Sequence, residues 1–132
     1  MTTIEILKSL KTLAVVGLSD NPTRTSYLVS KYMLEAGYKI IPINPNANSV
    51  FGIQSYPSLS DMPPHLKQEP ILVNVFRKSE DVPPIVDEAI AIGAKGIWLQ
   101  LGITHQTAIE KAKSAGLVTV QNRCIMVEHQ YL

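Results

Sequence analysis

Short, uninterrupted apolar runs are the feature that most constrains how this chain can fold. The first, Thr12–Gly17, lacks the alternation of apolar and polar residues seen in half-exposed strands, and it ends in a glycine. Runs of this kind are typical of strands buried on both faces, as in a parallel sheet. Pro42 lies inside the second run and lacks an amide donor, so we expect it at or near the end of its strand. The four later runs are Tyr38–Ile43, Ile71–Phe76, Gly96–Gln100 and Leu117–Gln121.

Helical periodicity fills the intervals between these runs. Apolar residues recur at helical spacing between Ser26 and Ala36, and Gly37 then provides a C-cap. Later helical patterns end in the same way at Gly93 and Gly116. Because right-handed crossovers join such units into a doubly wound sheet, we expect an α/β, Rossmann-like fold in one domain over residues 1–132. The expected sheet has five parallel strands in the order 3-2-1-4-5, with helices on both faces.

Composition excludes several classes of function. The net charge of +1 argues against a basic surface for nucleic acid, and no apolar stretch reaches the roughly 18 residues of a membrane span. His65, His105 and His129 lack the spacing of metal ligands with one another or with Cys124. Cys124 is the only cysteine, which excludes an internal disulfide and suits a reducing compartment. We expect a cytoplasmic protein that binds no nucleic acid, membrane or metal.

The three arginines of the chain share one position in the expected fold. Arg24, Arg77 and Arg123 each fall just beyond the carboxyl end of an expected strand. In an open parallel sheet this edge is where ligands bind. A guanidinium group is a permanently charged, planar fork that suits phosphate oxygens. Lys78 adds another cation at the same edge, so we expect a phosphorylated small molecule to bind there.

The segment after the first strand leads into a helix, whose free N–H groups attract anions. Gly17 permits a tight turn there, and Ser19, Asn21 and Ser26 add polar groups. The dinucleotide motif G-x-G-x-x-G is absent, because Ser19 and Pro22 stand where glycines would be needed. The segment therefore predicts an anion site of another kind.

Asn44 follows the second strand, where NAD-binding folds carry an acidic residue for the ribose 2′-hydroxyl. A neutral amide does not repel a phosphate on the ribose. The site therefore suits a nucleotide with an additional phosphate better than it suits NAD. NADP and coenzyme A (CoA) both meet that description, and sequence spacing does not separate them.

A series of motifs resembles the stand-alone CoA-binding domain proteins, over about residues 10–130. The motifs occur in the same order as in that family: Val15–Pro22 with Arg24, Ser26 and Tyr27, then Ile41–Pro45, Val75–Ser79, Val86–Ala89, Trp98–Gly102 and Asn122–Cys124. The same fold forms the N-terminal domain of the succinyl-CoA synthetase α subunit and of ADP-forming acyl-CoA synthetases. The resemblance implies that CoA or an acyl-CoA binds at the carboxyl edge of the sheet.

The resemblance and the loop chemistry together imply a set of CoA-binding residues around that edge. They are Gly17, Ser19, Asn21, Arg24, Ser26, Asn44, Pro45, Val75, Phe76, Arg77, Val82, Gln100, Gly102, Asn122, Arg123 and Cys124. The backbone near Ser19 and Asn21, with Arg24, would meet phosphate oxygens. Asn44 and Pro45 would border the ribose and adenine.

Three of these residues have a structural alternative. Phe76 and Val82 would offer apolar contact to the adenine or the pantetheine arm, but they also fit core packing. Gln100 would face the ligand or satisfy backbone groups. Arg77 would bind phosphate or cap the crevice.

No catalytic constellation is evident, because a nucleophile needs an adjacent base and no histidine is forced close to Cys124. Cys124 is a small packed residue or a reactive thiol with Arg123 beside it. The ligase chemistry of the synthetases uses a phosphohistidine and ATP-grasp modules in other domains, so it does not transfer to this chain. We expect a non-catalytic module for CoA or acyl-CoA, acting alone, with a protein partner or as a homo-oligomer. The alternative is an NADP-dependent oxidoreductase or redox sensor, for which 132 residues leave little room for a substrate pocket.

Overall fold

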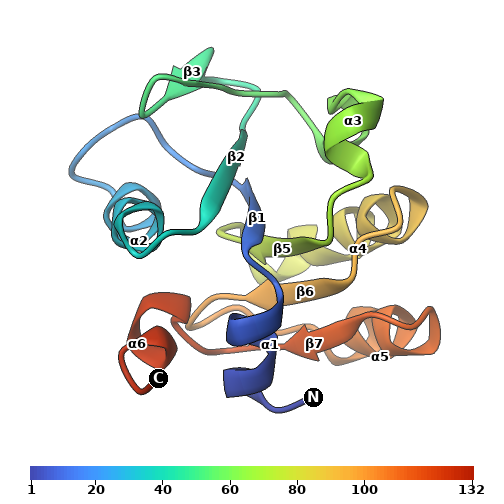
Figure 1. The fold of residues 1–132 in the computed structure, drawn as a ribbon. Helices are drawn as coiled ribbons and strands as arrows, with labels where there is room; N and C mark the ends of the chain where they lie inside the picture. The colour runs from blue at the N-terminus through green and yellow to red at the C-terminus, as the bar shows by residue number, and fades with distance from the viewer.

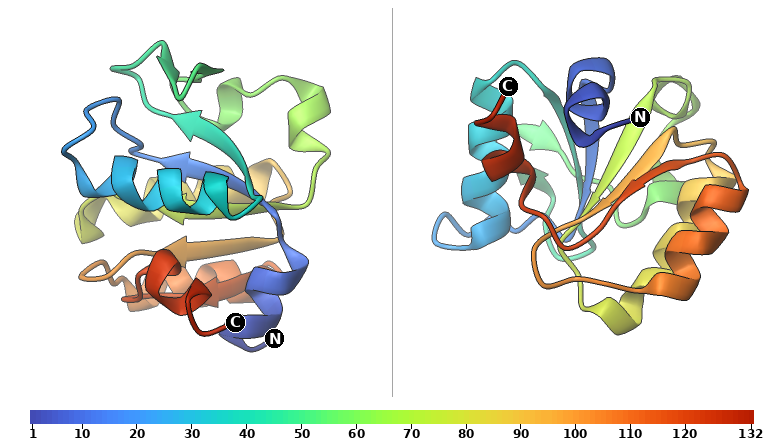
Figure 2. Two further views of the ribbon diagram at one scale, coloured as in Figure 1. Left: turned by 60° about the vertical axis from the view of Figure 1, so that its left-hand side comes forward. Right: turned by 90° about the horizontal axis from the view of Figure 1, so that it is seen from below.

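A five-stranded parallel sheet forms the centre of the molecule, and helices cover both of its faces (Figures 1 and 2). The computed structural model describes residues 1–132. The long strands are β1 (Thr12–Val16), β2 (Lys39–Ile43), β5 (Ile71–Val75), β6 (Gly96–Leu99) and β7 (Val118–Val120). Each pairs in parallel with its neighbours. The expected α/β, Rossmann-like class is therefore confirmed.

The order of the strands differs from the expected one. The sheet runs β2-β1-β5-β6-β7, which is 2-1-3-4-5 when the long strands are counted along the chain, and not 3-2-1-4-5. β2 is an edge strand, and Pro42, its penultimate residue, explains why. On the side of β2 that faces away from β1, Pro42 offers only its carbonyl, which accepts a hydrogen bond from the Tyr56 amide. Since a full strand cannot pair on that side, the third long strand pairs with β1 instead.

The chain between β2 and β5 holds small elements that carry it past β1. They are the antiparallel pair β3 (Ser49–Val50) and β4 (Ile53–Gln54), a 3-10 turn at Leu59–Asp61, and α3 (Pro64–Lys67). With β5 beside β1, the reversal of strand order falls between these two strands. The sequence predicts the crevice between the first and the fourth long strands. The structure places it between the first and the third, which are β1 and β5.

The helices divide between the two faces of the sheet, as the view from below shows (Figure 2). One face packs against α1 (Thr3–Ser9), α2 (Thr25–Glu35) and α6 (Ile125–His129). The other packs against α3, α4 (Val82–Ala91) and α5 (Gln106–Ser114), and a 3-10 turn at Ser79–Asp81 precedes α4. None of the helices is long and apolar enough to cross a membrane.

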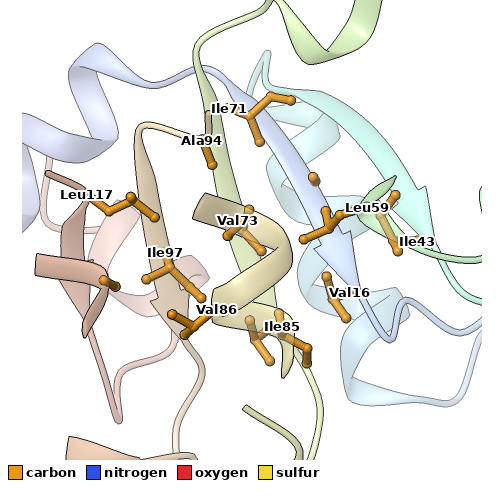
Figure 3. Close-up of a cluster of buried hydrophobic side chains, with 14 of the residues drawn as sticks. Val16, Ile43, Leu59, Ile71, Val73, Ile85, Val86, Ala94, Ile97 and Leu117 are labelled. Carbon is orange, nitrogen blue, oxygen red and sulfur yellow. The ribbon is translucent and has the colours of Figure 1, made fainter. Parts of the chain in front are cut away.

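Alternate residues of each strand supply the two cores. On the α4 side, Val73 and Ile97 lie under Ile85 and Val86 (Figure 3), and all four are buried. A fully buried side chain of this kind contributes about 1.5–3 kcal/mol. Burial of both faces of the sheet explains the absence of alternation in the strand sequences.

Tyr38 ties the first helix to the edge of the sheet. Its hydroxyl donates to the carbonyl of Leu7 and accepts from Lys11 Nζ at 3.4 Å. Burial raises the pKa of the Tyr38 hydroxyl, and the nearby Tyr32 raises it further.

This pKa shift predicts a loss of stability at high pH. Because the pKa of Tyr38 is higher in the folded than in the unfolded state, its contribution is full below the unfolded value of about 10 and is lost as the pH rises through the folded value. Urea unfolding above pH about 10 should therefore show a steeper loss of stability in the wild type than in Tyr38→Phe. Tyr131→Phe, at an exposed position, should keep the wild-type slope. Parallel slopes for all three proteins would contradict this assignment.

Gly17 allows β1 and β5 to meet closely at their carboxyl ends. It has φ of +87°, and a Cβ atom built on it would lie 2.5 Å from the carbonyl oxygen of Phe76. Gly116 also has a positive φ, of +92°, but no atom lies within 4 Å of its Cβ position. Comparing substitutions at the two glycines therefore separates the cost of a strained backbone from the cost of a steric clash.

Substitution of these two glycines tests the close approach. Gly116→Ala should cost about 1–2 kcal/mol, because only the left-handed backbone is strained. Gly17→Ala should cost clearly more, because the methyl group also meets the Phe76 backbone. Urea unfolding measures both values, and equal losses would show that the contact at Gly17 relaxes freely.

Candidate functional site

An open cleft of about 1120 Å³ lies at the carboxyl edge of the sheet, where β1 and β5 diverge. It is lined by loops that follow β1, β2, β5 and β6, and by the residue that precedes α6. This is the edge at which the sequence places the ligand. The lining residues are Gly17, Ser19, Asp20, Thr23, Arg24, Thr25, Ser26, Asn44, Asn46, Phe76, Arg77, Lys78, Asp81, Gln100, Leu101, Ile103 and Cys124.

The N-terminus of α2 opens into this cleft. Arg24 is the N-cap residue and makes no side-chain capping bond. The amide groups of Thr25, Ser26 and Tyr27 have no hydrogen-bond acceptor within the protein. Free amides at the start of an eleven-residue helix carry a partial positive charge. With the exposed Arg24 side chain, these amides place donors and positive charge together at one end of α2.

Polar side chains in the loop before α2 hold the loop in shape. Ser26 Oγ accepts a hydrogen bond from the Ser19 amide at 3.0 Å, and Ser19 Oγ accepts one from the Asn21 amide at 3.0 Å. Asn21 Oδ1 accepts from both the amide and the hydroxyl of Thr23. These acceptor atoms are therefore committed to the loop, while the serine O–H groups and the backbone amides at the start of α2 remain available as donors.

Asn44 joins the first two loops of the cleft. Its Nδ2 donates to the carbonyl of Leu18 at 2.9 Å, and its Oδ1 accepts from the Asn46 amide at 2.9 Å. Both ends of the side-chain amide are engaged, so Asn44 sets the distance between the loops. The structure thus gives a reason for an amide, in place of an acid, at the end of β2.

Arg77 lies between the main cleft and a second, smaller pocket. Its Nε is 3.3 Å from the Cβ position of Gly17, so the side chain crosses directly over that glycine. On its other side a smaller pocket of about 270 Å³ contains Pro45 in its wall. Asp81 lines both spaces as well. Arg77 is therefore placed to reach a ligand in either one.

The charges around the main cleft are mixed. Arg24, Arg77 and Lys78 supply three cations, whereas Asp20 and Asp81 supply two carboxylates. The carboxylates were not among the residues predicted from the sequence, although Asp20 lies in the first loop.

Gln100 and Cys124 line the part of the cleft that follows β6 and β7. Gln100 is 4% exposed, and its Oε1 accepts from the Ile125 amide at 3.0 Å. Its Nε2 has no partner in the protein. Gln100 thus both satisfies a backbone group and presents a donor to the cleft, which joins the two roles that the sequence left as alternatives.

Six of the expected site residues do not line the main cleft or the smaller pocket: Asn21, Val75, Val82, Gly102, Asn122 and Arg123. Val75 and Val82 are fully buried in the core on the α4 side. Asn122 accepts from the Gly102 amide and holds two loops together. The Arg123 side chain is largely exposed and pairs with Glu128 at 3.4 Å. The three arginines therefore do not form one group.

Several lining residues stand outside the predicted set of CoA-binding residues: Asp20, Thr23, Thr25, Asn46, Lys78, Asp81, Leu101 and Ile103. Most follow directly on strands whose ends were expected at this edge. Selecting every residue that follows the end of a strand would have included them. Selecting by side-chain chemistry favoured the basic and amide residues instead.

Comparison with known families decides the affiliation of the chain. Residues 11–130 match the model of a CoA binding domain. The chain belongs to this CoA-binding domain family. The match covers every strand of the main sheet and every loop of the cleft.

Individual proteins are similar to the chain as well. An uncharacterized protein of Bacillus subtilis, YneT, is 41% identical over 126 residues, which cover 95% of this chain and 90% of that protein. A hypothetical protein from Pyrococcus horikoshii is 40% identical with a TM-score of 0.90, covering 98% of this chain and 89% of that one. An ADP-forming acetate–CoA ligase of Methanocaldococcus jannaschii is 31% identical over 87 residues, 65% of this chain. Those residues amount to 12% of the ligase.

The buried acceptor of Gln100 makes a testable contribution to the cleft. Gln100→Met preserves most of the side-chain volume but leaves the buried Ile125 amide without an acceptor. We expect a loss of about 1–3 kcal/mol in the free energy of unfolding. Gln130→Met, at an exposed position without a side-chain hydrogen bond, should change it by less than about 0.5 kcal/mol. Equal effects of the two variants would show that the bond to Ile125 is dispensable.

Proposed function

We propose that the cleft binds CoA or an acyl-CoA and that the chain acts as a non-catalytic binding module. The observation that carries the proposal is the free N-terminus of α2 beside Arg24 and Arg77, in a chain of the CoA-binding domain family. CoA presents a pyrophosphate and a further phosphate on its ribose. These groups require the donors and cations that this part of the cleft offers.

The dimensions of the cleft suit a large ligand. Pockets for drug-sized molecules measure about 300–1,000 Å³, and the main cleft reaches about 1120 Å³. The pyrophosphate would meet the amides of Thr25, Ser26 and Tyr27, and the ribose phosphate would pair with Arg24 or Arg77. The pantetheine arm would extend past Phe76 toward Gln100 and Cys124.

The residues of the cleft support binding more than catalysis. A nucleophile or a transferred proton requires a base within hydrogen-bond reach. None of the residues that line the cleft is a histidine, and its two carboxylates belong to the exposed Asp20 and Asp81. The free thiol of Cys124 suits a reducing compartment, and we propose the cytoplasm.

A panel of ligands tests the proposal by thermal unfolding. CoA and acetyl-CoA should stabilise the protein, by about 2.7 kcal/mol when present at 100 times the dissociation constant. NAD, which lacks the additional ribose phosphate, should not. Stabilisation by NADP without stabilisation by CoA would contradict the proposal and favour a nicotinamide-dependent activity.

Arginine variants locate the binding site. Arg24→Ala should weaken CoA binding by roughly tenfold or more, because a charge-assisted hydrogen bond contributes about 1.5–3 kcal/mol. It should also reduce the dependence of the affinity on salt. Arg123→Ala removes the same charge from a side chain outside the cleft and should leave the affinity within about twofold. Isothermal titration measures both, and equal affinities would remove Arg24 from the site.

A further inference from the structure

The end of the cleft at Cys124 carries chemistry that phosphate binding does not use. The thiol is free and half-buried, and it lines the cleft. Cys124 is the only cysteine of the chain. A disulfide at this position therefore joins the protein to another molecule.

Gln100 shows that this end of the cleft is built to receive a polar group. The side chain is more than nine-tenths buried and lines the cleft. Its Oε1 is fixed by the amide of Ile125, the residue after Cys124, so the Gln100 amide is held next to the cysteine. Its Nε2 has no partner in the protein and is not among the unpaired polar atoms sealed in the interior. Water can reach this donor in the open cleft, so a ligand that covers Gln100 and displaces the water must offer an acceptor, since an unpaired buried donor costs free energy.

The charges of the cleft select the molecule that would reach Cys124. Arg24, Arg77 and the free amides of α2 favour a ligand with several phosphates. A thiol compound without phosphates has no such attraction to the site. A ligand anchored by its phosphates and extending to Gln100 carries its far end to the sulfur of Cys124.

We infer that Cys124 forms a mixed disulfide with the pantetheine thiol of CoA, an inference that rests on the proposed function. The co-reactant is CoA disulfide. The Cys124 thiolate attacks one sulfur of CoA disulfide, so that a bond forms between Sγ and that sulfur while the original S–S bond breaks. The departing CoA thiolate takes up the proton that Cys124 released. The exchange consumes no other oxidant, and a second thiol reverses it.

Intact-mass measurements on the reduced, full-length protein test this inference. CoA disulfide should add the mass of one CoA less two hydrogen atoms, and reductant should remove it. Because binding places the reacting sulfurs together, CoA disulfide should react about tenfold faster than glutathione disulfide at equal concentration. Cys124→Ser should give no adduct. Arg24→Ala should slow the reaction with CoA disulfide but not with glutathione disulfide, and Lys95→Ala, at the opposite edge of the sheet, should slow neither.

Binding and reaction are measured separately, so that the two proposals can fail separately. In the presence of reductant no disulfide persists, and stabilisation by CoA then reports the proposed function alone. Stabilisation without an adduct, or equal rates for the two disulfides, would overturn the inference on Cys124 and leave the proposed function in place. Absence of both stabilisation and adduct would overturn both.

Discussion

The close contact of β1 and β5 at their carboxyl ends is the constraint on which the candidate site depends. The missing side chain of Gly17 lets the carbonyl of Phe76 approach to a distance that no Cβ atom would permit. The segments that follow the two strands then turn in different directions, from β1 toward α2 and from β5 toward α4. This divergence opens the cleft and brings the Arg77 side chain over the first loop. The close packing of β1 and β5 thus determines where the Arg77 guanidinium group lies in the cleft.

The loop between β1 and α2 divides its polar groups between structure and solvent. Ser19, Asn21 and Ser26 use their oxygen atoms as acceptors for amides within the loop. The donors left over include the backbone amides at the start of α2, where the helix dipole favours an anion. A side chain that a sequence motif marks as a ligand contact can therefore act by holding the backbone donors in position.

Much of the fold followed from the sequence, because it depends on local patterns. Unbroken apolar runs predicted the five strands, and glycines predicted the ends of the helices. The strand order did not follow, since it depends on pairing between distant segments. Pro42 did carry the missing information, because a residue without an amide donor favours an edge strand and so excludes a strand outside β2.

The candidate site was predicted in part for a similar reason: position relative to strand ends placed Arg24, Arg77 and Gln100 correctly at the cleft. It could not show that Val75 and Val82 face the core or that Arg123 turns away to Glu128, since side-chain direction depends on the packed structure.

The central claim is that free amides at the start of α2 receive the phosphates of CoA. A titration with CoA, followed by backbone amide NMR in the presence of reductant, measures this residue by residue. The resonances of Thr25, Ser26 and Tyr27 should shift most, and those of Lys39 and Lys95 at the opposite edge should stay unchanged. Shifts confined to that opposite edge, or an unmoved α2 N-terminus under saturating CoA, would contradict it.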